Sequence, residues 1–134
     1  MFPPIFQCGK TGIGDKYLML SVVINPDIDI TVKFKNLDPL LNPVSFVTKS
    51  NGGPFKPANP SVSFDVIVPA ENVVKGDSIH PSIGVVAKTT ADVEIWQNGN
   101  QLDITNTPPG TALKSFKLTI ATGNVLASRE VELA

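Results

Sequence analysis

The chain has 134 residues, a formal net charge of −1 from 11 basic and 12 acidic residues, and a hydrophobic fraction of 42%. This length predicts one domain with a substantial core. The charge is balanced and the chain has no basic run that could bind nucleic-acid phosphates, so we expect no DNA or RNA partner. No apolar run approaches the roughly 20 residues that span a bilayer, and no basic amphipathic stretch is present, so we expect no membrane insertion.

Residues 1–16 are predicted to form an N-terminal arm, followed by a single domain over 17–134. The opening MFPPIFQCGK has neither the basic start nor the long apolar run of a secretory signal peptide. The lone cysteine, Cys8, cannot form an internal disulfide. A free arm would expose Phe2, Ile5 and Phe6, so we expect it either to fold back on its own domain or to dock on a neighbouring copy.

The segment CGKTGIGDKY, residues 8–17, contains fragments of two nucleotide-binding motifs. A phosphate-binding loop needs a glycine where this chain has Pro4, which has no N–H to donate. The dinucleotide motif needs a third glycine where Tyr17 stands, and a helix after it. We therefore expect no nucleotide and no other cofactor, and we assign these glycines to a turn that leads into the first strand.

Alternating apolar and polar residues predict strands with one buried and one solvated face. The segment Tyr17 to Ile24 is apolar on both faces apart from Ser21, which is typical of a central or doubly covered strand. Clear alternation predicts strands over 28–34, 61–68, 92–96 and 115–120, and weaker patterns predict strands over 44–48, 82–88, 101–105 and 125–133.

Turn signals separate these segments. Asn98-Gly99 predicts a two-residue hairpin turn, because both central residues of a type I′ turn need positive φ. The stretch 69–74 is the best helical candidate, and we expect one turn at most. About eight or nine short strands predict an all-β fold, an antiparallel β-sandwich with immunoglobulin-like or jelly-roll topology.

Residues 36–60 are rich in proline and contain Gly52-Gly53. We expect a long irregular excursion with one short strand inside. Such a loop is either functional or ordered by a partner, or an ordinary crossover between two sheets. On the first alternative, Pro54 and Phe55 are its candidate interface residues.

Catalytic and metal-binding patterns are weak. The one histidine, His80, is predicted to be a solvated loop residue, because its proximity in sequence to Asp77 and Ser78 is not triad geometry. One His and one Cys cannot build a zinc site. Oxygen ligands at 25, 27 and 29 (Asn25, Asp27 and Asp29) indicate either a calcium site completed by Asp103 or Asp92, or ordinary turn residues.

Trp96 is predicted to lie on the face opposite Val93 and Ile95. If those two residues point inward, Trp96 is at the surface, where it can stack on a sugar or anchor a protein partner; the alternative is that it caps the core near the hairpin turn. With Gln97, Asn98 and Asn100 it forms the candidate ligand-binding set.

Two functions remain open. The first is a non-enzymatic structural protein that binds copies of itself as a homo-oligomer, or decorates a larger protein assembly such as a virion, tail or surface filament. It would use the arm residues Phe2, Ile5 and Phe6 with Pro54 and Phe55, by burial of apolar area and strand addition. The second is a lectin-like module that binds carbohydrate at Trp96, with calcium assistance.

Overall fold

The computed structural model describes residues 19–36, 43–57, 63–85, 89–107, 110–120 and 126–134. These ranges form thirteen β-strands and one short 3₁₀ turn. In chain order the elements are β1 (Met19–Val22), β2 (Ile30–Lys35), β3 (Pro43–Ser50), β4 (Gly53–Phe55), β5 (Phe64–Val68), η2 (Ala70–Asn72), β6 (Ser78–Val85), β7 (Thr89–Gln97), β8 (Asn100–Gln101), β9 (Ile104–Thr107), β10 (Ala112–Leu113), β11 (Ser115–Ile120), β12 (Leu126–Ser128) and β13 (Glu130–Leu133).

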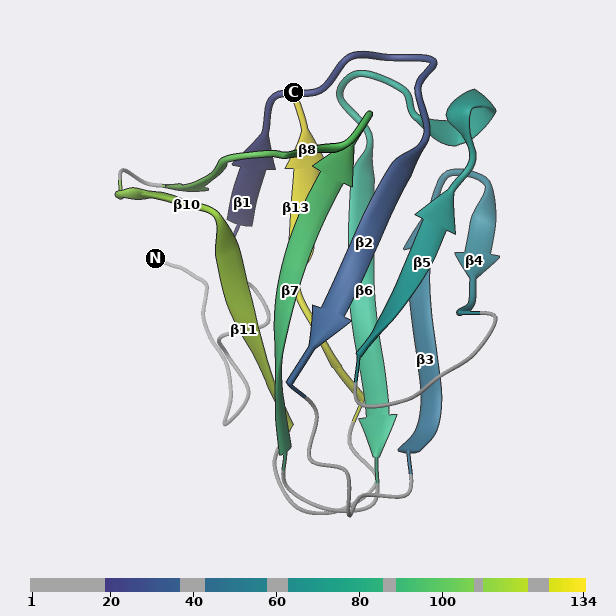
Figure 1. Cartoon of the computed structure of the whole chain (residues 1–134), viewed down its shortest axis with the longest axis vertical. Helices are drawn as coiled ribbons and strands as arrows, with labels where there is room; N and C mark the ends of the chain where they lie inside the picture. Colours follow the sequence, from purple (N-terminus) through teal and green to yellow (C-terminus); the bar gives the residue numbers. More distant parts are fainter. Residues whose placement is uncertain (1–18, 37–42, 58–62, 86–88, 108–109, 121–125) are drawn as a thin grey trace, which may run out of the picture.

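The strands form two sheets that lie face to face (Figure 1). The larger sheet has eight strands, seven in the order β10-β9-β1-β13-β6-β3-β4 and β12 paired with β6. The smaller sheet has five, in the order β11-β7-β2-β5 with β8 paired to β7. The pairs are antiparallel except β1 with β13, which run parallel. The described residues contain no α-helix, so the predicted all-β, sandwich-like fold is confirmed.

The core lies between the two sheets and is built from every second residue of the strands. In β2 and β5 the burial alternates strictly, which is the pattern that the sequence predicts. Phe34 of β2 and Phe64 of β5 stack with ring centroids 5.0 Å apart. The larger sheet contributes Leu20, Val22, Ile79, Ile83, Ile104, Val131 and Leu133, and the smaller contributes Ile30, Val32, Phe34, Phe64, Val66, Val68, Ala91, Val93, Ile95, Phe116 and Leu118.

The strand predictions differ from the structure mainly in number and in the proline-rich region. The expected eight or nine strands are too few, because several weak patterns divide into shorter strands. Residues 36–60 were expected to hold one short strand, but they contain the eight-residue β3 and the edge strand β4, joined as a hairpin. Proline occurs here at a strand start (Pro43) and on an edge strand (Pro54), the two positions where a sheet tolerates it.

Pro81 explains a break in the larger sheet. It lies inside β6, where a proline has no N–H to give to the ladder. The registers Ile79↔Val131 and Ser82↔Ser128 place Arg129 opposite Pro81. Arg129 is the residue that separates β12 from β13. The strand predicted over 125–133 is therefore present, but its ladder is interrupted where β6 lacks a donor.

His80 lies in β6 and not in a loop as predicted. The residue before a proline favours extended backbone, which fits a strand as well as a loop. Its Nε2 atom is 3.7 Å from Oε2 of Glu130 on β13, and Lys49 of β3 pairs with it on the other side.

The predicted helical turn over 69–74 is confirmed as a single 3₁₀ turn, η2, with Pro69 just before it. None of the described residues forms a helix long and apolar enough to cross a membrane.

The β3–β4 turn packs closely against η2. A Cβ atom on Gly52 would overlap the side-chain amide of Asn72, and the N–H of Asn51 donates to Oδ2 of Asp77 at 3.2 Å. The absence of a side chain at position 52 is therefore a packing requirement as well as a turn preference.

We expect Gly52→Ala to lower the free energy of unfolding by about 1–3 kcal/mol, because the new methyl group displaces Asn72. Urea unfolding followed by circular dichroism measures this. The double variant Gly52→Ala/Asn72→Ala removes the clashing amide, so Gly52→Ala should cost less in that background. An equal cost in both backgrounds would show that the contact with Asn72 is not the cause.

Candidate functional site

Trp96 lies on the outer face of the smaller sheet. Val93 and Ile95 are fully buried, so the alternation of β7 turns Asp92, Glu94 and Trp96 outward. Trp96 itself is partly buried and does not belong to the core between the sheets. The sequence left two positions open for Trp96, one at the surface and one capping the core. The structure shows the surface position.

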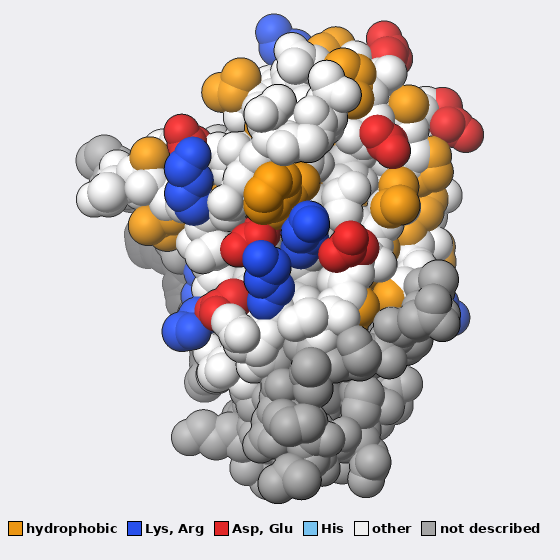
Figure 2. Space-filling view, in the orientation of Figure 1, with side chains coloured by type: hydrophobic (Ala, Val, Ile, Leu, Met, Phe, Trp, Pro, Cys, Tyr) orange, Lys and Arg blue, Asp and Glu red, His pale blue; other side chains and the backbone are white. Residues whose placement is uncertain are grey.

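Cross-strand pairing surrounds Trp96 with polar and charged neighbours. Its register partners are Thr31 on β2 and Gln101 on β8. The next outward-facing row across the sheet contains Asp65, Lys33, Glu94 and Ser115, and the row after it contains Lys35, Asp92 and Lys117. Acidic and basic residues therefore alternate across the strands within each row, while each strand keeps one sign along its length. Figure 2 shows this interleaving of blue and red side chains around a central hydrophobic one.

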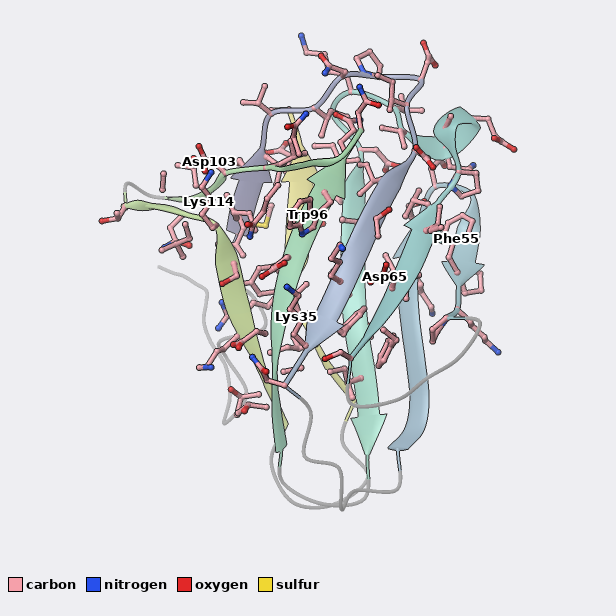
Figure 3. The ribbon with its side chains drawn as sticks, viewed as in Figure 1. Lys35, Phe55, Asp65, Trp96, Asp103 and Lys114 are labelled. Atoms are coloured by element: carbon pink, nitrogen blue, oxygen red, sulfur yellow. The ribbon has the colours of Figure 1, made fainter. Side chains whose placement is uncertain are left out.

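Two contacts fix the indole ring. Its Nε1–H donates to Oε1 of Glu94 at 2.9 Å, and Nζ of Lys33 lies 4.7 Å from the ring centroid. Oε1 of Glu94 also pairs with Nζ of Lys35 at 3.1 Å. Figure 3 shows Trp96 and Lys35 on the same face of the sheet. The result is an oriented aromatic ring with a cation over it and a carboxylate at its edge.

Both carboxylates of β7 are held in the charged form. The hydrogen bond from Lys117 (2.7 Å), then that from Asn36 (2.6 Å), lowers the pKa of Asp92 below its ordinary 3.8 against the opposing effect of burial. Burial alone would raise the pKa of Glu94. The hydrogen bonds from Trp96 and Lys35, together with the positive charges of Lys35 and Lys33, instead bring that pKa below its ordinary 4.5. Both groups are acceptors only at neutral pH.

Gln97 points the other way from Trp96. It is 3% exposed, and its side-chain amide binds the β1–β2 connection. Nε2 donates to the carbonyl oxygens of Asn25 (2.7 Å) and Ile28 (3.2 Å), and Oε1 accepts from the N–H of Asn25 (2.9 Å). This burial separates Gln97 from the other candidate ligand-binding residues and gives it a structural role. The signal was in the sequence, since position 97 has the same parity as Val93 and Ile95.

The hairpin turn after β7 carries the two remaining candidates. Asn98 and Gly99 have φ values of 53° and 80°, the positive values that a type I′ turn requires, so the predicted turn is confirmed. Asn98 and Asn100 are exposed, and Nδ2 of Asn100 donates to the carbonyl of Asn98 at 3.3 Å. Asn100 is the register partner of Gln97, so it faces away from Trp96, whose own register partner on β8 is Gln101.

The predicted interface residues divide into two groups. Phe2, Ile5 and Phe6 lie outside the described residues, as do Cys8 and the glycines of the arm. Pro54 is exposed on β4, whereas Phe55 is partly buried and packs against the core. The neighbouring edge strand β5 adds Ile67, whose side chain is 54% exposed and which sequence reasoning did not single out.

The candidate calcium ligands Asn25, Asp27 and Asp29 are exposed and lie in the β1–β2 connection, whose backbone Gln97 binds. Asp27 has a φ of 64°, a conformation that Asn and Asp adopt in turns. Over the ranges that the structure describes, His, Cys, Asp and Glu side chains form no group of three or more that could hold a metal ion.

No family model matches the chain, and comparisons with curated proteins and with solved structures also found no match.

Lys33, Lys117 and Ile67 complete the outer face but were not singled out from the sequence. Alternation could have placed each of them on a solvated face. Their closeness to Trp96 or to the sheet edge depends on the pairing of β2, β5, β7 and β11, which no local pattern reveals.

We expect Gln97→Ala to lower the free energy of unfolding by about 1–3 kcal/mol, because it removes three hydrogen bonds to partly buried backbone groups of the β1–β2 connection. Gln97→Glu should cost more at neutral pH, since its carboxylate would face two carbonyl oxygens. The pKa of that new carboxyl would be raised, so Gln97→Glu should regain stability as the pH falls. Denaturant unfolding at several pH values measures both, and an unaffected Gln97→Ala protein would contradict this role.

The lowered pKa values of Asp92 and Glu94 predict a stability that falls with acidification. Folding favours the ionised forms, so this contribution is complete above the ordinary values of 3.8 and 4.5 and is lost as the pH falls through the lower folded values. Thermal unfolding between neutral and acidic pH should show a smaller decline for Asp92→Asn/Glu94→Gln than for the parent. Asp103→Asn, which removes an exposed pair with Lys114, is the control. If the unfolding temperature fell equally with pH in the parent and the double variant, Asp92 and Glu94 would not be the source of the pH dependence.

Proposed function

We propose that this chain is a non-enzymatic structural protein that assembles with copies of itself, or decorates a larger assembly such as a virion, tail or filament. The observation that supports this most is the state of the sheet edges. A strand at an open edge presents unpaired backbone groups that can pair with another chain, and proteins usually protect such strands.

Three of the four terminal strands carry a recognised form of protection. β10 is two residues long, β4 is three residues long and contains Pro54, and β11 carries Lys117. β5 differs, because its five residues contain neither proline nor lysine. Its one charged residue, Asp65, lies opposite Lys33 on β2. β5 is thus the least protected terminal strand among the described residues.

Exposed apolar side chains accompany this edge. The terminal strands of both sheets, β4 and β5, lie beside each other, and we call Gly53–Phe55 together with Phe64–Val68 the β4–β5 side (Figure 1). Ile67 and Pro54 are exposed here and Phe55 is partly buried. Figure 2 shows hydrophobic side chains along this side of the molecule. Two of the five predicted interface residues, Pro54 and Phe55, belong to it.

The proposed partner is a second copy of this chain. Antiparallel pairing of β5 with its own copy about Val66 would set Asp65 opposite Ile67 of the second copy, which avoids two facing carboxylates. It would also cover Ile67 and extend the smaller sheet across the contact. Such a two-fold contact closes on itself. Further copies would then need another surface, for which the apolar arm residues Phe2, Ile5 and Phe6 are the candidates.

The proposal extends to the finer topology. The parallel pairing of β1 with β13 favours an immunoglobulin-like arrangement over a jelly roll, whose strands are antiparallel. The Cys…Trp…Cys signature of true immunoglobulin domains is absent from the sequence, so this likeness concerns architecture alone.

We expect Ile67→Lys to shift the protein towards monomer, because it places a charge on the contact and a lysine on the open edge. Light scattering behind a sizing column, over a range of protein concentrations, measures the mass of each species. The matched control is Val23→Lys, which changes another exposed aliphatic residue (79% exposed) directly after β1, away from β4 in the larger sheet. A parent chain that is monomeric throughout would refute self-assembly, and equal effects of both variants would refute the β4–β5 side.

A further inference from the structure

We propose that the outer face of the smaller sheet around Trp96 is a second binding site, and that it takes a neutral saccharide. The observation behind this is the oriented indole ring with Lys33 over it and Glu94 at its edge. The site lies on β7, two strands in from β5, so it does not depend on the assembly proposed above.

The ring has what a stacking platform needs. Trp96 is partly buried, and its Nε1–H is fixed by Glu94 at 2.9 Å, so the ring plane is set before a ligand arrives. Preorganisation of this kind lowers the entropic cost of binding. Nζ of Lys33, 4.7 Å from the ring centroid, shows that the ring accepts a partner above it. A lysine has a flexible stem, so a ligand can displace it without rearranging the sheet.

Hydrogen-bonding groups of both kinds surround the ring. Lys33 supplies donors, the ionised carboxylate of Glu94 supplies acceptors, and the side-chain amide of Gln101, the register partner of Trp96 on β8, carries both. A sugar presents hydroxyl groups that donate and accept, next to an apolar ring face that stacks on an aromatic surface. Donors, acceptors and an apolar platform in one place therefore match a polyhydroxylated ring better than a purely apolar ligand.

Charge balance favours a neutral ligand. Three basic residues of this face (Lys33, Lys35 and Lys117) are matched by three acidic ones (Asp65, Asp92 and Glu94), alternating along the strand registers. Lys35 and Lys117 already form ion pairs within the face, at 3.1 and 2.7 Å. A polyanion would meet the carboxylates as well as the lysines, so it gains little from this surface.

The chain contains a single tryptophan, so tryptophan fluorescence, excited where the one tyrosine does not absorb, reports this face alone. The probes are neutral gluco-, manno- and galacto-oligosaccharides, each titrated into the full chain to millimolar concentration, with a heparin oligosaccharide as the anionic comparison. We expect at least one neutral probe to shift the emission saturably and to reduce quenching of Trp96 by acrylamide. Calorimetry should then show that Trp96→Ala weakens that probe's binding by at least about tenfold.

The control variant is Thr119→Ala, which changes an exposed residue of β11 on the same face away from the ring and should bind like the parent. Circular dichroism checks the fold of each variant. Because the quenching measurement uses the unmodified protein, it decides the question even if Trp96→Ala fails to fold. The proposal is overturned if no neutral probe changes emission or quenching, if only heparin does so, or if Trp96→Ala binds as the parent does.

Discussion

The alternation of buried and outward-facing residues along the strands of the smaller sheet is the constraint on which the rest of the structure depends. Ile30, Val32 and Phe34 of β2 fill the core together with Val93 and Ile95 of β7. Once these side chains are inside, their sequence neighbours must be outside, and a slip of one residue would reverse both sets. The charged rows and Trp96 are therefore the outward complement of the core.

Hydrogen bonds connect the chain segments at the end of the sandwich where β1, β7 and β13 terminate. The amide of Gln97 binds the backbone of Asn25 and Ile28, and the N–H of Ala134 donates to the carbonyl of Val22 at 2.6 Å. The N–H of Gly76 donates to the carbonyl of Leu133 at 2.6 Å. Each bond satisfies backbone groups beyond the regular strand ladders. The end of β7, where the β7–β8 hairpin begins, is therefore bonded to the β1–β2 connection, which holds the strand end that carries Trp96.

The sequence predicted the strands that have one buried and one solvated face. Strands β2, β5, β7 and β11 alternate clearly, and the Asn98-Gly99 turn has a local conformational cause. β3 and β6 were predicted weakly or with shifted ends, because they contain prolines and serines within the larger sheet. Sheet order could not be predicted, since pairing joins segments far apart in the chain. The position of Gln97 could have been, by extending the parity of Val93 and Ile95.

The same limit applies to the surfaces. Pro54 and Phe55 were predicted as interface residues from a proline-rich stretch, and the structure adds Ile67 beside them because β4 and β5 both end their sheets. For Trp96, alternation left a surface position and a position capping the core open; the structure shows the surface one, and pairing adds Lys33 above its ring. In both cases a local pattern identified one or two residues, and the contacts across strands supplied their neighbours.

Hydrogen–deuterium exchange at low and high protein concentration tests the central claim, that copies of this chain meet along the β4–β5 side. Backbone amides that become paired or covered in a contact exchange more slowly. The account predicts that protection of Gly53–Phe55 and Phe64–Val68 rises with concentration, while that of the other terminal strand of the smaller sheet, β11, stays constant. Exchange that is independent of concentration throughout, or protection that rises only at β11, would contradict it.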